Sequence, residues 1–276
     1  MSAGLFGELE FIKASAAVTG AAFMAGGVIV LAPQIVKSLG AQAVLTAIGA
    51  CAAPIDSTAG KIDLKSVAKD ELARRAAEQA AGVARAAKRS FDISAAIFLL
   101  VALSPLLAAT ALAIRLDSRG PILYRQRRIG LGGREFEIFK FRSMRQDAEK
   151  GGPCWAEKDD KRVTRVGRFI RRTRIDEIPQ AINIFKGEMS FVGPRPERPE
   201  FVRLLETEIP HYHARHLVKP GITGWAQVRF VYTASVEGAR DKLGYDLFYI
   251  KHMSPLLDAL IVLMTVRVAL LGLGSR

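Results

Sequence analysis

The sequence predicts a mostly α-helical protein with one small β-hairpin (an α+β chain) that lies in a membrane surface without crossing it, as monotopic membrane proteins do. Three observations predict this. An uncharged run from Ile93 to Ile114 has Ser104-Pro105 at its centre and cations beyond both ends. Two short segments, 122–126 and 136–141, alternate in polarity. The chain of 276 residues is also both basic, with a net charge of +13, and 50% hydrophobic.

The composition restricts the class of partner. A chain of this length can form one or two domains with a substantial core. Its positive charge suits a surface that faces anionic lipid and a site that handles phosphorylated substrates. Nucleic-acid binding would explain the charge as well. The two cysteines, Cys51 and Cys154, have no metal-ligand spacing, so they indicate neither a disulfide framework nor a zinc site and fit a reducing compartment.

Residues 1–60 form a hydrophobic N-terminal extension. No charged residue occurs from Ala14 to Val36 or from Ser38 to Ile55. The first run is long enough to span a bilayer and the second is marginal, so the two can form a helical hairpin with small-residue contacts. A pair of buried Ala-rich helices is the soluble alternative. We do not expect a secretory signal, because a second hydrophobic run and a basic region follow.

Residues 61–90 are predicted to be a charged helical linker. Acidic and basic residues alternate there with alanines, which have the highest helix propensity. We expect this helix to lie at the membrane interface or in solvent. The main domain would then occupy residues 91–276.

The uncharged run at 93–114 is predicted to be a re-entrant helix. A straight helix of this length would rise roughly 33 Å, enough to cross a bilayer. Pro105 removes an intrahelical hydrogen bond and clashes with the preceding turn, so the helix should break there, and Ser104 can satisfy the open carbonyl. Cations flank both ends, which places both in the cytoplasm. A straight transmembrane helix is the alternative.

The two alternating segments are predicted to pair as a β-hairpin, since Gly-Pro and Gly-Gly turns accompany them. Lys140 and Arg142 share one face of the second strand, because side chains alternate along a strand. This pair can hold phosphate or form a solvated strand face. The Gly130–Gly133 cluster is not a dinucleotide fingerprint, because no strand–helix unit of the right length surrounds it.

Seven cations fall within residues 161–174, among apolar residues at helical spacing. We predict an amphipathic helix whose cations rest on anionic lipid. A nucleic-acid stripe would carry similar charge, but the interleaved aliphatic residues fit membrane or core contact better. We therefore expect no nucleic-acid partner. The preceding Asp159-Asp160 is interpreted as a solvated loop and not as a metal motif.

Two adjacent carboxylates, Asp176 and Glu177, follow these arginines. Pro179 fits a first helical turn, so Asp176 is expected to be the N-cap of a helix that continues to about Phe185 and ends at Gly187. The N-terminus of a helix carries partial positive charge and favours anions.

Arg171 and Arg195 add full positive charges to this carboxylate pair. The pair would then stay ionised inside an anion-binding pocket, where it could perform nucleophilic chemistry on a phosphate. Ordinary helix capping with salt bridges on a solvated face is the structural alternative.

The last third of the chain is predicted to be mainly helical. Residues 197–216 form a helix interrupted at Pro210, and residues 219–228 form a turn-rich loop. Helices follow over 245–250 and 256–273; charged residues leave the last one only a short uncharged core, so it should lie on the membrane or pack. Three histidines are interpreted as surface residues, since no carboxylate or cysteine stands beside them at metal spacing: His211, His213 and His216.

Several motifs in order resemble the bacterial sugar transferases, the monotopic polyprenyl-phosphate phosphoglycosyl transferases. The main ones are Thr164–Thr173, Asp176–Gln180, Lys186–Ser190 and Val192–Pro196. Lys88–Asp92, Lys140–Met144 and the loop at 219–228 are also similar to family motifs. The likeness extends from about Lys88 to the C-terminus, roughly two thirds of the chain.

The resemblance implies a re-entrant helix broken at Ser104-Pro105 and a ping-pong reaction. Asp176 would attack the β-phosphate of a UDP-sugar, releasing UMP and leaving a sugar phosphate on the aspartate. A polyprenyl (undecaprenyl) phosphate would then take up that sugar phosphate. By the same resemblance, Arg195 would bind nucleotide phosphate. Because an anionic nucleophile meets an anionic diphosphate, we also expect a Mg²⁺ held partly by Glu177, the second catalytic residue. The expected substrate-binding residues are Lys88, Arg89, Lys140, Arg142, Arg171 and Arg195.

The sequence thus predicts a transferase of the bacterial inner membrane, with its catalytic part on the cytoplasmic face, that begins a polysaccharide or glycoconjugate such as an exopolysaccharide. A hexose donor is the interpretation from the resemblance; an acetamido sugar and a homo-oligomer are left open. A non-catalytic basic adaptor for membrane or nucleic acid is the alternative function. A direct sugar transferase, which would release UDP, is the alternative enzyme.

Overall fold

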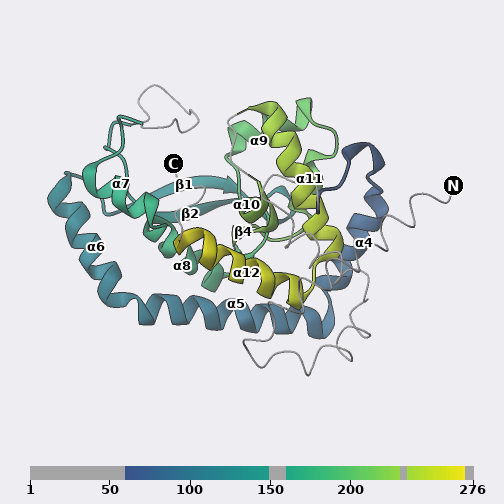
Figure 1. The fold of residues 1–276 in the computed structure, drawn as a ribbon, viewed down its shortest axis with the longest axis horizontal. Coiled ribbons are helices and arrows are strands. Elements are labelled where there is room, and N and C mark those ends of the chain that lie inside the picture. The colour runs from purple at the N-terminus through teal and green to yellow at the C-terminus, as the bar shows by residue number, and fades with distance from the viewer. Residues whose placement is uncertain (1–59, 149–159, 231–234, 271–276) are drawn as a thin grey trace, which may run out of the picture. The chain divides into compact units, whose positions relative to one another are not determined.

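The computed structural model describes residues 60–148, 160–230 and 235–270 (Figure 1). Contacts divide the chain into two units, Met1–Gly60 and Lys61–Arg276. The hydrophobic extension predicted for residues 1–60 therefore lies outside the described residues, except for Gly60, and so does Asp159. The fold described below is that of the second unit, which is mostly helical.

The charged segment after residue 60 is helical, as predicted. It contains the short 3-10 turn η3 (Leu64–Ser66) and helix α4 (Lys69–Gln79). Leu72 and Ala76 of α4 are buried where the helix packs against later elements of the chain. The segment is therefore packed into the fold on one face and is not wholly in solvent.

Helices α5 (Gly82–Ala102) and α6 (Ser104–Asp117) are bent by 62° at their junction and form the two arms of an L in Figure 1. The hydroxyl of Ser104 donates to the carbonyl of Val101 at 2.8 Å. This is the carbonyl that the N–H of an ordinary residue at position 105 would have bound. The predicted helix break is confirmed. The expected boundary between linker and main domain, at residues 90 and 91, lies inside α5.

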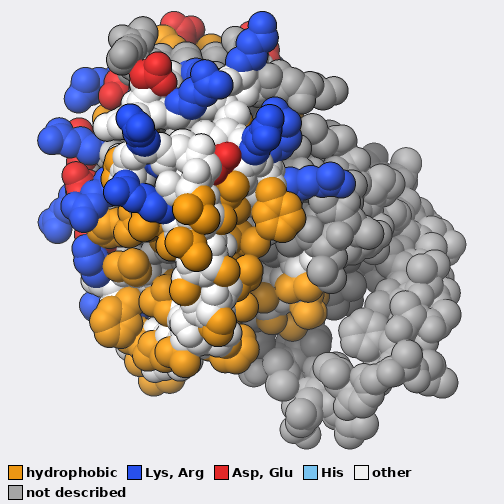
Figure 2. All heavy atoms as spheres, turned by 90° about the vertical axis from the view of Figure 1, so that its left-hand side faces the viewer, with side chains coloured by type: hydrophobic (Ala, Val, Ile, Leu, Met, Phe, Trp, Pro, Cys, Tyr) orange, Lys and Arg blue, Asp and Glu red, His pale blue; other side chains and the backbone are white. Residues whose placement is uncertain are grey.

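In the described part of the chain, no helix is by itself both long and apolar enough to cross a bilayer, whereas α5 and α6 reach that standard as a bent pair. Both arms expose large apolar side chains: Phe91, Ile97, Phe98, Val101, Leu106, Leu112 and Leu116. Figure 2 shows the side of the molecule that lies on the left in Figure 1. On this side apolar side chains gather in the lower half, beneath a group of Lys and Arg side chains.

Strands β1 (Leu123–Ile129) and β2 (Glu135–Phe141) pair antiparallel, with Tyr124 opposite Lys140. The turn η4 (Leu131–Gly133) between them has positive φ at both Gly132 and Gly133, a conformation that glycine adopts without strain. The predicted hairpin is confirmed, and its first strand is longer than expected.

A second small sheet was not predicted. Strands β3 (Ser190–Val192) and β4 (Gly221–Thr223) pair in parallel, so part of the expected loop at 219–228 is a strand, and α10 (Trp225–Arg229) follows it. The backbones approach closely: a Cβ on Gly221 would lie 2.1 Å from the nitrogen of Gly193. Only glycine fits at such a contact.

The remaining elements agree in kind with the expected helices. They are α7 (Arg165–Arg172), η5 (Ile175–Gln180), α8 (Ala181–Lys186), α9 (Pro199–Glu208), η6 (Tyr212–Leu217), α11 (Val236–His252) and α12 (Pro255–Leu270). The predicted interruption near Pro210 separates α9 from η6. The expectation that all three histidines lie at the surface is wrong for His216, which is buried because η6 packs against α11.

Two apolar clusters hold the short turn η5 from both ends. Ile175, at its start, packs in the first cluster with Ile114, Phe141 and Ile170. Ala181, just after its end, packs in the second with Ala96, Ile138, Ile184 and Met189. The residues between Ile175 and Ala181, which include both carboxylates, are therefore fixed by packing that draws on α5, α6, α7 and the hairpin.

Candidate active site

The turn η5 carries Asp176 and Glu177, and both side chains are buried. Arg174 precedes the turn in the left-handed conformation, with φ 59°, and its carbonyl accepts the N–H of Glu177 at 3.2 Å. The prediction that Asp176 is an N-cap is wrong, because Asp176 lies inside a 3-10 turn and regular helix begins only at Ala181. Pro179 has no N–H to begin an α-helical ladder there. The predicted end at Gly187, with φ 86°, is confirmed.

Glu177 binds two cations that come from different elements. Lys140 on β2 donates to its Oε1 atom at 3.0 Å. Arg195, which follows β3, donates to both carboxylate oxygens, with Nη1 at 3.3 Å from Oε2. Burial raises the pKa of Glu177, but the charges of Arg195 and Lys140 outweigh it and hold this pKa well below its ordinary value. Glu177 is therefore ionised at neutral pH.

Asp176 makes no such contact with any described residue. In the part of the chain that the structure describes, its Oδ1 atom is buried and has no hydrogen bond. Burial and the negative charge of Glu177 raise the pKa of Asp176 to about 6. At neutral pH the side chain is mostly a carboxylate, and one of its oxygens accepts no hydrogen bond from the described residues. Two neighbouring carboxylates thus differ in character because only one of them is held by cations.

Burial lowers the pKa of Lys140, and Glu177 opposes that shift. The charge of Glu177 raises the pKa of Arg195. Both cations therefore depend on Glu177 for their own stabilisation, as Glu177 depends on them. One anion and two cations are therefore held together by ion pairs, and they lie beside Asp176, which has no such ion pair among the described residues.

Two further polar residues lie at this site and were missed by sequence reasoning. Arg128 of β1 and Gln180 of η5 line a small cavity with Lys140 and Arg195, about the space that one water molecule needs. The Nε2 atom of Gln180 is buried without a hydrogen-bond partner among the described residues. A buried donor of this kind is ready to bind an oxygen of a ligand or of water.

Such an arrangement suits nucleophilic attack on a phosphate. A buried carboxylate with a free oxygen can attack phosphorus, and cations fixed beside it can screen the negative charge of the phosphate and of the leaving group. Residues 83–272 match the family described as bacterial sugar transferase.

This chain belongs to the bacterial sugar transferase family.

Curated relatives agree with that membership. The chain is 50% identical over 189 residues to an Aeromonas hydrophila protein named UDP-N-acetylgalactosamine-undecaprenyl-phosphate N-acetylgalactosaminephosphotransferase, covering 68% of this chain and 45% of the relative. It is 45% identical over 181 residues to a Caulobacter vibrioides UDP-glucose:undecaprenyl-phosphate glucose-1-phosphate transferase, covering 65% and 68%. It is 40% identical over 185 residues to the exopolysaccharide production protein PSS of Rhizobium leguminosarum bv. phaseoli, covering 65% and 92%. The chain thus spans less than half the length of the Aeromonas relative.

In this chain, Arg142 and Arg171 are not brought to the carboxylate pair. Arg142 lies one residue beyond β2, and its guanidinium donates to the carbonyls of Ser118 and Arg119 at 2.7 and 2.9 Å. Arg171 is half-buried on α7, and no hydrogen bond joins it to Asp176 or Glu177 among the described contacts. Arg174 supplies the positive charge from this side, since it lowers the pKa of both carboxyl groups.

Lys88 and Arg89 anchor α5 to the rest of the fold. The ammonium group of Lys88 binds Asp258 of α12 and, at 3.3 Å, the carbonyl of Val192. Arg89 donates to the last carbonyls of α8, those of Ile184 and Phe185, at 2.6 and 2.8 Å. Both cations therefore contact protein groups that fix the apolar helix to the core.

A buried asparagine ties α8 to the hairpin. Asn183 accepts the N–H of Phe139 at 3.0 Å and donates to the carbonyl of Glu137 at 2.6 Å. These two bonds hold β2, and with it Lys140, beside the turn that carries Glu177. No pattern in the sequence indicates this contact, because its partners are backbone groups about 45 residues away.

Proposed function

We propose that this chain transfers a sugar 1-phosphate from a UDP-sugar to a polyprenyl phosphate, through an intermediate on Asp176. The observation that carries the proposal is the contrast between the two carboxylates. Glu177 is neutralised by Lys140 and Arg195, whereas Asp176 keeps a buried oxygen that no described residue hydrogen-bonds. Family membership and the relatives' names support the same reaction class.

In the first step, a carboxylate oxygen of Asp176 attacks the β-phosphorus of the donor. The bond between that phosphorus and the oxygen bridging to the α-phosphate breaks, and UMP leaves with the electron pair. In the second step, a phosphate oxygen of the polyprenyl phosphate attacks the same phosphorus. The bond to Asp176 breaks, the carboxylate is regenerated and polyprenyl diphosphate-sugar is formed.

The chain's own cations have defined roles in this scheme. Arg195 and Lys140 offset the charge of Glu177 and of the incoming diphosphate, so that an anionic nucleophile can approach an anionic substrate. Arg128 and Gln180 add donors on the same side, beside the small cavity. Burial of the pair excludes water that would otherwise hydrolyse an acyl phosphate.

The residues present fit a magnesium ion of the kind that substrates help to hold. Within the described residues no group of three or more His, Cys, Asp or Glu could hold a metal ion. Mg²⁺ needs only one or two protein carboxylates, because phosphate oxygens and water complete its octahedron. Glu177 would share its carboxylate with the ion, and Asp176 would keep its free oxygen for the attack. When bound, the ion would neutralise charge on the diphosphate.

We also propose that α5 and α6 enter one leaflet of the inner membrane from the cytoplasmic side and return. The exposed apolar side chains of both arms and the cations beyond both ends support this placement. Cysteines introduced at positions 85 and 119, in a chain without Cys51 and Cys154, should react with an impermeant maleimide from the same side of membrane vesicles. Labelling from opposite sides would support a transmembrane crossing instead.

The reaction is tested with the full chain, undecaprenyl phosphate and a set of UDP-sugars, with detection of the released nucleotide. We expect UMP, and we expect Asp176→Asn to lose turnover by about 10³-fold or more while still binding membranes. The matched control is Asp241→Asn, whose half-exposed carboxylate pairs with Lys61 and should leave turnover unchanged. Release of UDP would contradict the scheme and indicate direct sugar transfer.

A trapping experiment identifies the nucleophile. Without acceptor lipid, the chain and UDP-sugar should yield a peptide that contains Asp176 and carries the mass of a sugar phosphate. We propose a hexose as the sugar; relatives named for glucose and for N-acetylgalactosamine make both donors necessary in the screen. A chain that releases no nucleotide from any donor, and binds membranes regardless of Asp176, would instead be a basic adaptor.

A further inference from the structure

The segment that carries Arg195 is held by its carbonyl groups. Pro194, Arg195, Pro196 and Glu197 form a segment that we call the Arg195 loop. Two of its four residues are prolines, which have no N–H to donate, so N–H bonds cannot hold the loop as they hold a strand. Its four consecutive carbonyls accept instead from Gly221 N–H at 2.9 Å, Arg215 Nη2 at 2.8 Å, Arg128 Nη1 at 3.1 Å and Ile129 N–H at 3.0 Å.

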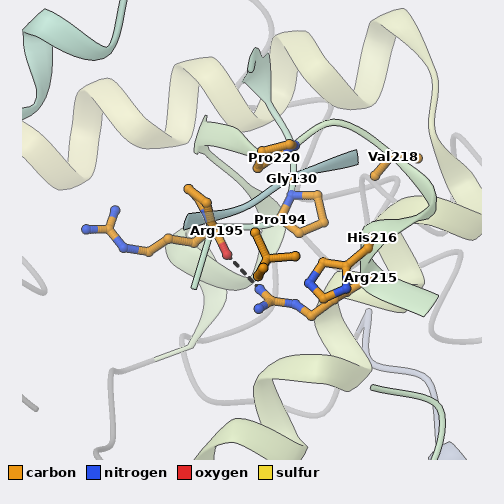
Figure 3. A pocket seen from close by; sticks show the side chains of 9 residues that line it. Gly130, Pro194, Arg195, Arg215, His216, Val218 and Pro220 are labelled. Atoms are coloured by element: carbon orange, nitrogen blue, oxygen red, sulfur yellow. Dashed lines mark hydrogen bonds between the residues drawn. The ribbon is translucent and has the colours of Figure 1, made fainter. Parts of the chain in front are cut away.

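Among these donors, Arg215 binds the residue whose side chain contacts Glu177. In Figure 3 the carbonyl of Arg195 points to Arg215, while the Arg195 side chain extends the opposite way. One residue therefore has its backbone held on one side and its guanidinium presented on the other. A shift of the carbonyl would carry the guanidinium away from Glu177.

Arg215 is itself fixed. It lies in η6, is 3% exposed, and donates through Nε and Nη2 to Asp246 of α11 at 3.1 and 2.8 Å. Its Nη1 atom donates to the hydroxyl of Tyr212 at 3.0 Å. The guanidinium thus binds Asp246, Tyr212 and the Arg195 carbonyl. Of these three contacts, the one with the Arg195 carbonyl connects it to the active site.

A buried ion pair is a costly way to stabilise a fold. Desolvation of the two charges offsets most of their attraction, and an apolar pair of similar size often stabilises as well. What the Arg215–Asp246 pair supplies, and an apolar pair could not, is a rigid donor directed at a chosen carbonyl. Arg215 lines a cavity of about the size of a water molecule, together with Pro194, Gly130 and Val218.

We infer that Arg215 is a positioning residue, which holds the carbonyl of Arg195 so that the Arg195 side chain reaches Glu177. This inference rests on the proposed function wherever turnover is the readout. In this role Arg215 affects the rate only by setting the position of Arg195. Misplacement of an active-site group by about 1 Å can cost on the order of 10²-fold in rate.

A double-mutant cycle on the full chain tests this route. Arg215→Lys keeps the positive charge beside Asp246 but lacks the fork that reaches Asp246, Tyr212 and the carbonyl together. We expect it to lower kcat/KM by about 30-fold in the wild-type background and less than about 3-fold in Arg195→Met. Arg142→Lys is the matched control, since Arg142 is also buried and donates to backbone carbonyls. Its effect should be the same in both backgrounds.

A second readout does not need turnover. Phenylglyoxal modifies accessible guanidinium groups, and peptide mass spectrometry reports the rate at Arg195. We expect Arg215→Lys to speed modification of Arg195 about tenfold, and Arg142→Lys to leave it unchanged. If Arg215→Lys does not fold, Tyr212→Phe, which removes one partner of Arg215, should give a smaller change of the same kind.

The outcomes separate the two proposals. Equal losses from Arg215→Lys in both backgrounds, or no change in the modification of Arg195, would overturn the positioning role even if the chain releases UMP. Absence of UMP release by the wild-type chain would overturn the proposed function, whereas faster modification of Arg195 in Arg215→Lys would still support the positioning role.

Discussion

At the scale of single residues, the carboxylate pair divides its work by environment. Asp176 and Glu177 are adjacent and both buried, yet their pKa values move in opposite directions. Of the two carboxylates, Glu177 is the one that Lys140 and Arg195 hydrogen-bond, so it carries the permanent charge, whereas Oδ1 of Asp176 has no hydrogen bond from the described residues. Pushing the pKa values of two neighbouring groups apart is how one site obtains two distinct chemical roles.

This contrast predicts the pH dependence of turnover. The nucleophile must be ionised, and burial together with the charge of Glu177 raises the pKa of Asp176 to about 6. We therefore expect kcat/KM to rise about tenfold per pH unit below about pH 6 and to level off above it. Initial rates of UMP release between pH 5 and 8 measure this. A flat profile would show that Asp176 has an ordinary, low pKa.

Glu197 predicts an acid sensitivity of the fold itself. Its carboxylate pairs with Lys242 and, at 3.8 Å, with Arg128. Burial raises its pKa, but Lys242, Arg215 and Arg128 outweigh burial and lower the pKa to about 2. The folded-state pKa lies below the unfolded one, so the stabilisation is present above about pH 4.5 and is lost as pH falls toward 2.

Glu197→Gln should therefore lower the free energy of unfolding by on the order of 2 kcal/mol at pH 7, with little difference from wild type near pH 2. Chemical unfolding at several pH values measures the difference. The control is Glu200→Gln, because the exposed Glu200 pairs only weakly with Arg198 at 3.6 Å. An equal loss at all pH values would mean that Glu197 acts through packing and not through charge.

At the scale of elements, the α5–α6 bend depends on a side-chain hydrogen bond. Ser104→Ala removes the hydroxyl that donates to Val101, whose carbonyl has lost its usual donor to Pro105. We expect a loss of about 1 kcal/mol in the free energy of unfolding. Thr110→Ala is the matched control: Thr110 also donates to a helix carbonyl, that of Leu106, but there an ordinary N–H is available as well. Equal effects of the two substitutions would contradict this account of the bend.

Gly193 tests the close contact between β3 and β4. A Cβ at this position would lie 2.4 Å from the carbonyl oxygen of Lys219, so Gly193→Ala must push the strands apart. We expect a loss of about 3 kcal/mol in the free energy of unfolding and slower turnover, because the Arg195 loop follows directly. Gly130→Ala, whose Cβ would lie 3.1 Å from a Phe136 ring atom, should cost less. Thermal unfolding and UMP release measure both; equal costs would show that the strands adapt.

The elements also show which parts of the structure a sequence can predict. The hairpin and the break at Ser104-Pro105 follow from local alternation and from the geometry of proline, so they were predicted correctly. The parallel pair β3–β4 joins three-residue strands about 30 residues apart, and no local pattern marks it. At the site, resemblance predicted roles for Asp176, Glu177, Lys140 and Arg195, and the structure brings these residues together. Arg128, Gln180 and Arg215 act through tertiary contacts, which a single chain's pattern does not reveal.

At the scale of the whole unit, the apolar and basic faces define an orientation. The large exposed apolar side chains are concentrated on the two arms of the L, α5 and α6. The lower half of the side shown in Figure 2 is largely apolar, and Lys and Arg side chains lie above it. Such a pattern suits a molecule whose apolar face enters lipid while its cations meet anionic headgroups.

The exposed apolar side chains of α5 predict how the chain binds to membranes. Phe98 and Val101 of α5 are 69% and 67% exposed in the absence of lipid. Burying each in hydrocarbon is worth about 1.5–3 kcal/mol, so Phe98→Ser combined with Val101→Ser should weaken binding to vesicles by 10²-fold or more. Leu204→Ser is the control, because Leu204 is exposed on α9, at the opposite end of the unit from α5 in Figure 1.

Flotation with anionic vesicles at low and high salt measures binding. Apolar contact is not screened by salt, so the difference between the double variant and the control should persist at high salt. If high salt alone releases the wild-type chain, binding is purely electrostatic and the arms of the L do not enter the bilayer.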